Sequence, residues 1–240
     1  MIDLSLLEKY VSKNGFSLSG EQLDHFSAFY EMLIEKNKVM NLTAITDSDE
    51  VVTKHFIDSL SLITAVDDLG LEDYSLIDLG TGAGFPGIPL KIAFPNLKIT
   101  LFDSLNKRIN FLNDVILSLN LSDIRAIHGR AEEFGKNPEH RERYDICVSR
   151  AVANLSTLSE YCLPFVKVGG RFISYKTESI DDELSSAYKA VTQLGGGDCI
   201  VKKYELYGTD AMRSLLVIDK EKSTPKKYPR KAPMPSRSPL

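Results

Sequence analysis

Three glycines within five residues form the most distinctive local pattern in the chain. Gly80, Gly82 and Gly84 follow the short apolar run 75–79. A run of this length predicts a buried parallel strand, and the glycines after it allow the backbone to turn tightly and to approach a ligand closely. Pro86 suits the first turn of a following helix. The pattern therefore predicts a ligand-binding turn between a strand and a helix.

The spacing of these glycines excludes two common phosphate-binding motifs. The dinucleotide fingerprint GxGxxG/A would need Gly or Ala where the chain has Phe85, and the GxxxxGK[ST] motif lacks its Lys and hydroxyl residue. The remaining pattern, DxGxGxG from Asp78 to Gly84, is similar to the first motif of S-adenosylmethionine (SAM) dependent methyltransferases. SAM carries no phosphate, so the glycines would serve close approach. A plain strand-to-helix turn is the alternative.

The glycine turn belongs to a longer alternation of strands and helices. Such an alternation predicts a parallel sheet covered by helices on both faces. We expect strands at 75–79, 98–102, 124–128, 145–148 and 171–176, helices at 86–94, 107–119, 154–165 and 180–194, and a hairpin of 199–207 and 214–219 at the sheet edge. Ligands of such sheets bind beyond the carboxyl ends of the strands, at the switch in strand order.

An acid about 20 residues after a glycine turn is typical of ribose binding. Asp103 follows the second predicted strand at about that interval. A helix N-cap is the other role open to this residue, because a helix is predicted soon after it. We expect Asp103 and the glycines on one rim of the sheet.

Four cations are predicted on the same rim. They follow the second to fifth strands and are Lys107, Arg130, Arg150 and Lys176. Such a cluster suits contacts with phosphates and bases, and ordinary surface charge is the alternative. His55 lies among apolar neighbours on a predicted helix, so a substrate role and a partly buried or surface histidine both stay open. The three cysteines are widely spaced, which argues against a disulfide framework and a zinc site, and no metal is implied.

Three regions are expected along the chain: a helical cap at 1–66, a methyltransferase domain at 67–219 and a basic, proline-rich tail at 220–240. In the cap, Ser19 and Gln22 predict a capping box. The tail has seven basic residues and one acid, a net charge of +6, which leaves −10 for residues 1–219. Its prolines predict an extended arm that could lie along phosphates, or a functionless terminus. No membrane span or signal segment is recognisable, so a cytoplasmic protein is expected.

Absent motifs narrow the methyl acceptor. Methylation of an exocyclic amine is usually associated with an N/D-P-P-Y segment, where this chain has Ser149-Arg150-Ala151-Val152. Carbon-5 methylation of pyrimidines needs a cysteine nucleophile, usually preceded by proline, and no cysteine of this chain has that context. A ring nitrogen such as guanine N7 needs neither, because its lone pair is free at neutral pH.

Several segments together resemble the RsmG family (formerly GidB), bacterial small-subunit rRNA guanine-N7 methyltransferases. The resemblance runs almost end to end, through NLTAI, KHFIDSL, DLGTGAGFPGIPLKI, DSLNKRINFL, GRAEE, VSRAVANL and KYPRKAPMPSRSPL. It implies a class I, Rossmann-like fold with a mostly parallel seven-stranded sheet and an N-terminal helical cap. Ala232 departs from a Gly common in the family's tail.

The resemblance also implies site residues and partners. SAM contacts are implied at Gly80, Phe85, Ala131, Glu132 and Arg150, with Asp103 near the ribose, and the glycine turn itself adds Gly82 and Gly84 as expected contacts. RNA or target-base roles are expected for Lys107, Arg130, Arg150 and Lys176, with no certain catalytic residue. The expected partner is 16S rRNA or the small ribosomal subunit, with a decoding-region loop as acceptor, and a monomer is expected. A noncatalytic RNA-binding assembly factor and a methyltransferase for a small molecule or protein stay open as alternatives.

Overall fold

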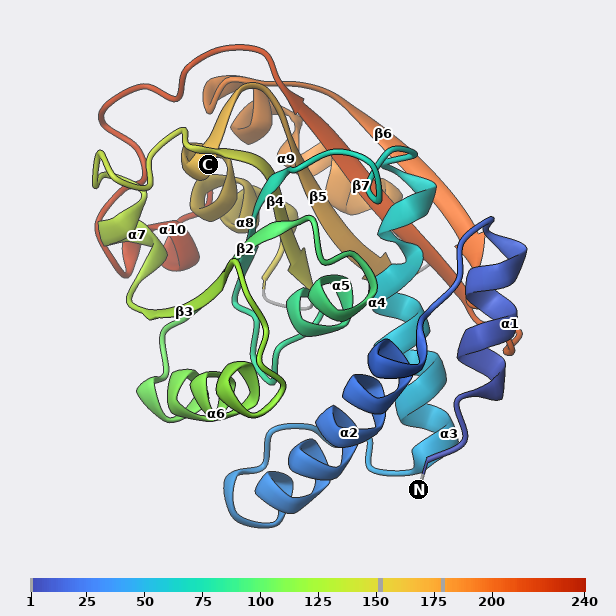
Figure 1. The fold of residues 1–240 in the computed structure, drawn as a ribbon. Helices are drawn as coiled ribbons and strands as arrows, with labels where there is room; N and C mark the ends of the chain where they lie inside the picture. The colour runs from blue at the N-terminus through green and yellow to red at the C-terminus, as the bar shows by residue number, and fades with distance from the viewer. Residues whose placement is uncertain (1, 151–152, 178–179) are drawn as a thin grey trace.

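The computed structural model describes residues 2–150, 153–177 and 180–240, so the Ala151-Val152 part of the segment after the fourth strand lies outside the described residues. Its centre is a seven-stranded sheet in the order β3-β2-β1-β4-β5-β7-β6 (Figure 1). The strands are β1 (Ser75–Leu79), β2 (Lys98–Asp103), β3 (Ile124–His128), β4 (Tyr144–Arg150), β5 (Val166–Thr177), β6 (Gly196–Glu205) and β7 (Met212–Lys220). Only the pairings of β7 with β5 and β6 are antiparallel. The predicted sheet and its closing hairpin are confirmed.

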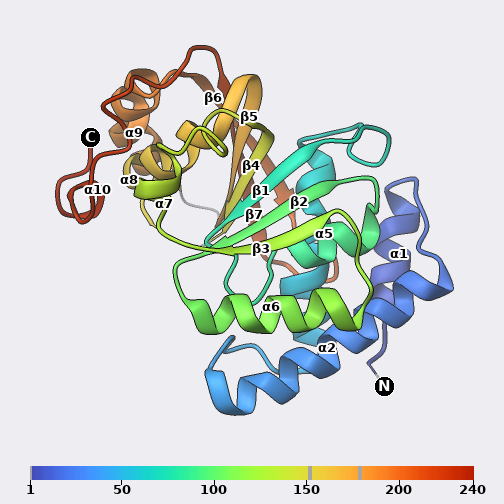
Figure 2. The same ribbon diagram turned by 60° about the vertical axis from the view of Figure 1, so that its left-hand side comes forward.

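Helices cover both faces of the sheet. Figure 2 shows α2 (Gly20–Met40) and α6 (Asn106–Ser118) on one side, and α8 (Leu155–Cys162) and α9 (Asp181–Gln193) on the other. The remaining helical segments are α1 (Ser5–Lys13), α3 (Ser48–Val51), α4 (Asp58–Leu60), α5 (Gly87–Ala93), α7 (Ala131–Phe134), α10 (Met234–Arg237), the π-helix η1 (Val52–Ile57) and the 3₁₀ turns η2 (Ser61–Thr64) and η3 (Leu163–Phe165).

Side chains that alternate along the central strands build two cores. Leu76 and Ile146 belong to the core beneath α2, α5 and α6, whereas their neighbours Ile77 and Cys147 belong to the core beneath α8 and α9. This alternation follows from the strand geometry, in which successive side chains point to opposite faces. Because both faces are buried, the central strands are almost uniformly apolar.

The N-terminal helices share the first core with the sheet. Ser19 and Gln22 form the predicted capping box at the start of α2, and Gln22 Nε2 also donates to Ile92 O of α5 at 2.7 Å. The helix predicted around His55 is not regular, because this segment divides into α3, η1, α4 and η2. Hydroxyls accompany these changes: Ser59 Oγ donates to His55 O and Ser61 Oγ to Asp58 O. Such back-bonding competes with the regular helical ladder and bends helices.

Two other predicted boundaries shift. The helix expected at 154–165 ends its α-helical part at Cys162 and finishes as η3, because Pro164 has no N–H to continue the ladder. Strand β5 begins at Val166, earlier than the expected residue 171.

The tail is folded against the body, which corrects the expectation of an extended arm. Arg230 Nη2 donates to Glu160 Oε2 at 2.6 Å, and Glu160 is fully buried. Arg141 Nη1 donates to the carbonyl of Tyr228 at 2.9 Å. The short helix α10 packs on α8. A buried carboxylate needs a charged partner, so Glu160 supplies a physical reason for the tail to fold back.

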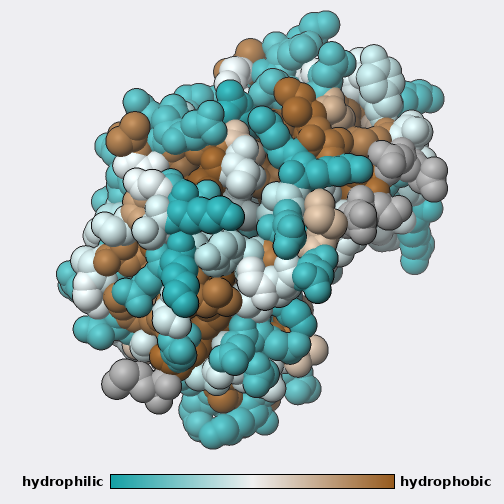
Figure 3. Space-filling model, turned by 90° about the vertical axis from the view of Figure 1, so that its right-hand side faces the viewer, coloured by the Kyte–Doolittle hydropathy of each residue, from teal (hydrophilic) through white to brown (hydrophobic). Residues whose placement is uncertain are grey.

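The surface mixes polar and apolar side chains. Figure 3 shows one face, on which hydrophobic side chains lie in separate patches among hydrophilic ones. Within the described ranges, no helix combines the length and apolar character needed to cross a membrane.

Candidate active site

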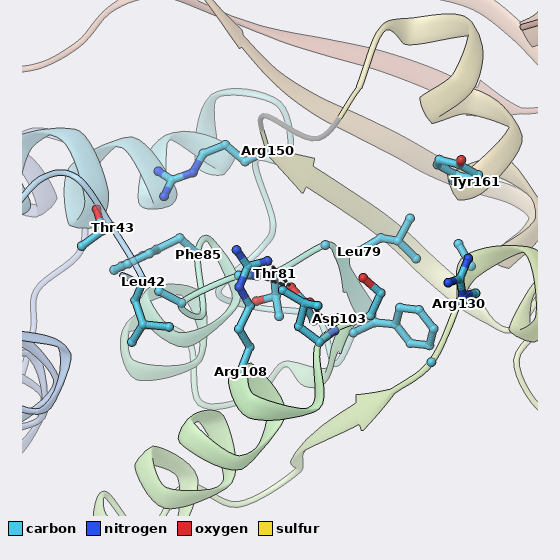
Figure 4. A pocket seen from close by; sticks show the side chains of 18 of the residues that line it. Leu42, Thr43, Leu79, Thr81, Phe85, Asp103, Arg108, Arg130, Arg150 and Tyr161 are labelled. Atoms are coloured by element: carbon cyan, nitrogen blue, oxygen red, sulfur yellow. Dashed lines mark hydrogen bonds and ion pairs between the residues drawn. The ribbon is translucent and has the colours of Figure 1, made fainter. Parts of the chain in front are cut away.

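A cleft of about 670 Å³ opens at the carboxyl ends of β1, β2 and β4. The strand order reverses between β1 and β4, so the cleft lies at the switch point where open α/β sheets bind ligands. Figure 4 shows side chains from both halves of the sheet and from the N-terminal segment converging on it. It is lined by Leu42, Thr43, His55, Leu79–Ala83, Phe85, Phe102–Leu105, Arg108, Gly129–Glu132, Arg150 and Tyr161.

The glycine turn forms the floor of the cleft. The amides of Gly80 and Thr81 donate to Phe102 O at 2.8 and 3.1 Å, which ties the turn to β2. Gly80 and Gly82 have φ of 76° and 61°, in the left-handed region that costs other residues energy. A Cβ on Gly82 would have only Gly80 O within 4 Å, at 3.9 Å. The backbone here is therefore open to close approach by a ligand.

Gly84 serves packing rather than the cleft. It does not line the cavity, and a Cβ at this position would lie 2.6 Å from Ile88 Cγ1 and 3.0 Å from Leu112 Cδ2. Gly84 therefore presents no surface to the cleft, where the predicted cofactor contact would lie. The absence of a side chain at Gly84 lets the turn pack against α5 and α6.

Asp78 fixes the turn from below. Its Oδ2 accepts from Thr81 Oγ1 at 2.7 Å and from Gly87 N at 2.8 Å, while Oδ1 has no hydrogen-bond partner among the described residues. Burial raises the pKa of Asp78 to about 6, although its two hydrogen bonds act in the opposite direction. The acid of the glycine motif is therefore a support for the loop and not a residue that lines the cleft.

Asp103 lies in the middle of the cleft and holds three groups. Oδ2 accepts from Gly82 N at 3.0 Å and from Arg108 Nη1 at 3.2 Å, and Oδ1 accepts from Leu105 N at 2.9 Å. A carboxylate oxygen can accept two hydrogen bonds, so Oδ1 keeps capacity for a further donor such as a ribose hydroxyl. Leu105, and not Asp103, is the N-cap residue of α6.

The segment after β3, where SAM contacts are predicted at Ala131 and Glu132, lies at the cleft. Arg130, Ala131 and Glu132 all line it, with Arg130 exposed at the rim. Tyr161 of α8 faces the same end, as Figure 4 shows. Burial raises the pKa of Tyr161, and the charge of Glu132 adds to the effect. This end of the cleft combines flat or small side chains with an acid.

The opposite end is built around Arg150. Its Nη1 donates to Asp58 Oδ2 at 2.9 Å and to Lys54 O at 3.2 Å, and its Nη2 lies 3.2 Å from His55 Nδ1. The His55 ring stacks on Phe85 with centroids 4.3 Å apart. Burial, followed by the charge of Arg150, lowers the pKa of His55 to about 3, so the imidazole is neutral.

Two of the predicted rim cations lie outside the cleft. Lys176 Nζ pairs with Glu183 Oε1 at 2.7 Å and also donates to Ala153 O. Lys107 is exposed on α6. The structure thus brings Arg130 and Arg150 to the cavity, while Lys107 and Lys176 are not among its lining residues.

Sequence reasoning missed several lining residues. Thr43, Arg108 and Tyr161 line the cleft, and Asp58 lies behind Arg150. A signal existed for Asp58, because KHFIDSL places it three residues after His55 on the same helical face. Thr43 and Tyr161 reach the cleft through long-range packing that no local spacing reveals.

The residues present fit SAM. Open backbone at Gly80 and Gly82, a spare acceptor on Asp103 and the apolar surfaces of Phe102 and Ala131 match a ligand with a nucleoside and an amino acid end. Within the ranges that the structure describes, no group of three or more His, Cys, Asp or Glu residues could hold a metal ion.

The sheet order and this cleft define a class I SAM-dependent methyltransferase. A solved SAM-dependent O-methyltransferase from Thermotoga maritima has a similar fold, with a TM-score of 0.51, 14% identity, and coverage of 80% of this chain and 73% of that one. The chain belongs to the family described as rRNA small subunit methyltransferase G (GidB), which matches residues 22–208.

Relatives that share the family description cover nearly the whole chain. Ribosomal RNA small subunit methyltransferase G of Ligilactobacillus salivarius is 54% identical over 94% of each chain. The protein of the same name from an Exiguobacterium species is 50% identical, again over 94% of each chain.

Proposed function

We propose that this protein transfers a methyl group from SAM to N7 of a guanine in the decoding-region loop of bacterial 16S rRNA. The proposal rests mainly on one observation: a cleft at the switch point of the sheet contains the glycine turn, Asp103 and Arg150. The chain also belongs to the rRNA small subunit methyltransferase G family. The name shared by the relatives supports RNA of the small subunit as the substrate. The chemistry of the cleft supports the acceptor atom.

The cleft is suited to an acceptor that needs no general base. His55 Nε2 lies 2.9 Å from Thr43 Oγ1, and Nδ1 contacts Arg150, so both ring nitrogens have partners. Guanine N7 carries a free lone pair at neutral pH, and its attack depends on alignment more than on proton transfer. An exocyclic amine would instead have to lose a proton.

SAM supplies an electrophilic methyl group. As N7 bonds to the methyl carbon, the bond from that carbon to sulfur breaks and its electron pair stays on sulfur. Asp103 and the backbone of Gly80 and Gly82 would hold the cofactor at the centre of the cleft, with Ala131 and Glu132 beside its adenosine. Positive charge develops on the guanine during transfer. Asp58 pairs with Arg150 at the acceptor end, so the charge of this guanidinium is balanced and does not oppose the charge that develops on the guanine.

Two exposed cations could contact the RNA backbone. Arg130 lies on the rim of the cleft and Lys107 on α6, and neither has an ion pair among the described residues. Phosphate contacts release counterions, so affinity for RNA should fall steeply with salt.

The test is methyl transfer from labelled SAM to small-subunit particles from cells that lack this protein. We expect label in 16S rRNA, falling as salt rises. Arg130→Ala should raise the KM for RNA and leave the Kd for SAM unchanged. Lys98→Ala is the matched control, because Lys98 is an exposed lysine at the other end of β2. Label in protein or small molecules instead of RNA would contradict the proposal.

Calorimetry distinguishes the proposed enzyme from a noncatalytic RNA-binding assembly factor. A scaffold that only binds RNA would show no SAM binding at concentrations that saturate the enzyme, whereas the proposal requires binding of one SAM per chain.

We further propose that the protein acts as a monomer in the cytoplasm, where bacterial ribosomes assemble. A mass measurement in solution, with and without SAM, tests the oligomeric state.

A further inference from the structure

One end of the cleft lies beyond Asp103 and the glycine turn, next to Phe85 and Arg150, the expected cofactor contacts nearest to it. Leu42 and Thr43, from the segment before α3, line it together with His55 of η1. Figure 4 shows Leu42 and Thr43 on the side opposite Arg130 and Tyr161, with Asp103 between the two ends. A nucleoside held at Asp103 and Ala131 would therefore leave the Thr43 end to the methyl acceptor.

The protonation of His55 follows from its neighbours. An arginine can only donate hydrogen bonds, so the contact of 3.2 Å from Arg150 Nη2 makes His55 Nδ1 the acceptor. The proton of the neutral ring is then on Nε2, which lies 2.9 Å from Thr43 Oγ1. The opposite tautomer would set an N–H of His55 against an N–H of Arg150. His55 therefore donates to Thr43.

Thr43 Oγ1 also accepts from the backbone of Ile45 at 3.0 Å. A hydroxyl has two lone pairs and one proton, so Ile45 and His55 use both lone pairs. No acceptor for the Thr43 proton is present among residues 2–150, 153–177 and 180–240. Since Thr43 lines the cleft and is partly exposed, its O–H is a donor available to a ligand there.

The edge of guanine that carries N7 offers one partner for such a donor. This edge presents two acceptors, N7 and O6, whereas adenine presents N7 and an N6 amino donor. The lone pair of N7 is consumed by methylation, which leaves O6 as the atom that the enzyme can recognise. A fixed donor at this point pairs with guanine and opposes adenine.

We propose that the Thr43 hydroxyl donates to O6 of the target guanine and so selects guanine over adenine. The inference rests on the proposed function. Arg150 and His55 act as positioning residues, because their contacts orient the Thr43 proton without contacting O6. A donor to O6 also leaves N7 itself unblocked.

The experiment compares Thr43→Val with Thr43→Ser on assembled small subunits whose target nucleotide is guanine, 2-aminopurine or inosine. 2-Aminopurine lacks O6 and keeps N7, while inosine keeps both and lacks the 2-amino group. With guanine, Thr43→Val should lower kcat/KM about tenfold and Thr43→Ser should retain most of it, because one hydrogen bond is lost only in the former. The Kd for SAM should be the same in all three proteins.

The base analogues keep the test decisive even if the valine variant folds poorly. The wild-type protein should lose about tenfold in kcat/KM on 2-aminopurine and little on inosine, whereas Thr43→Val should have nearly the same kcat/KM on 2-aminopurine as on guanine. Equal losses on the two analogues, or additive losses of variant and analogue, would overturn the inference. Weaker SAM binding by Thr43→Val would assign the hydroxyl to the cofactor instead. If the wild type methylates no guanine, the proposed function fails and this inference fails with it.

Discussion

His55 and Arg150, 95 positions apart in the chain, meet with 3.2 Å between Nδ1 and Nη2. The contact joins the N-terminal helical segment to the end of β4. It holds the guanidinium beside Phe85, with 5.2 Å between the Arg150 Cζ and the ring centroid. The acceptor end of the cleft is therefore an interface between a segment outside the sheet and the sheet itself.

The neutral state of His55 predicts a pH dependence of stability. Its folded pKa of about 3 lies below the ordinary histidine value of 6.5, so its contribution is fully present above pH 6.5 and is lost as the pH falls toward 3. Between pH 7 and pH 5 the wild type should lose about 2 kcal/mol of unfolding free energy from this residue. His55→Gln should lack this loss. Urea denaturation at both pH values measures it, and parallel losses in the two proteins would contradict the assignment.

Asp58 should be essential for the position of Arg150. It is a buried carboxylate that pairs with Arg150, and Tyr204 Oη donates to its other oxygen at 3.2 Å. Asp58→Asn leaves the partly buried Arg150 without its charge partner, which costs about 3 kcal/mol. We expect methyl transfer to fall at least about tenfold.

Tyr204→Phe is the matched control for Asp58→Asn. It removes one hydrogen bond to the same carboxylate while leaving the charge of Asp58 in place, and it should cost about 1.5–3 kcal/mol, with methyl transfer close to wild type. Similar activity losses in the two variants would show that Asp58 acts through the fold and not through Arg150.

Gly82 of the glycine turn and Gly87 at the start of α5 should respond differently to alanine. In Gly82→Ala the new Cβ meets open space at a φ of 61°, so stability should fall by only about 1 kcal/mol while SAM affinity falls at least about tenfold, through intrusion on the cofactor. In Gly87→Ala the Cβ would overlap Leu101 Cδ2 and lie 2.9 Å from Asp78 Oδ2. This variant should lose about 1–3 kcal/mol of stability through overpacking. Thermal unfolding and calorimetry distinguish the two, and the reverse ranking would mean that the cofactor does not contact Gly82.

Arg230 should anchor the tail. Its removal in Arg230→Ala leaves Glu160 buried and unpaired, which costs about 3–5 kcal/mol. The exposed neighbour Lys231 is the control, and Lys231→Ala should change stability by less than about 0.5 kcal/mol. Denaturant unfolding measures both, and equal stabilities would show that the tail does not contribute to the folded state.

Local patterns in the sequence predicted the sheet, the glycine turn and the placement of Asp103, because each depends on a short segment and on the general geometry of α/β sheets. The cluster of His55, Asp58 and Arg150 depends on how the N-terminal helices dock on β4. That docking is set by packing between distant segments, so spacing alone could not reveal it. The same holds for the fold of the tail, since Glu160 and Arg230 lie 70 positions apart.

The position of Lys176 outside the cleft could not be predicted, for a related reason. Its position at the carboxyl end of β5 favoured the rim, yet Glu183 of α9 binds its ammonium group. The pattern of strands predicts which end of the sheet a residue occupies. It does not predict whether another side chain already neutralises its charge.

The most direct test of the central claim is to identify the methylated nucleoside. Small subunits from cells that lack this protein are incubated with the purified protein and labelled SAM, and the 16S rRNA is digested and analysed by nucleoside mass spectrometry. We predict one labelled product, 7-methylguanosine, from a single position in the decoding-region loop. Label in any other nucleoside, or an unlabelled rRNA despite intact SAM binding, would contradict the assignment of guanine N7 as the acceptor.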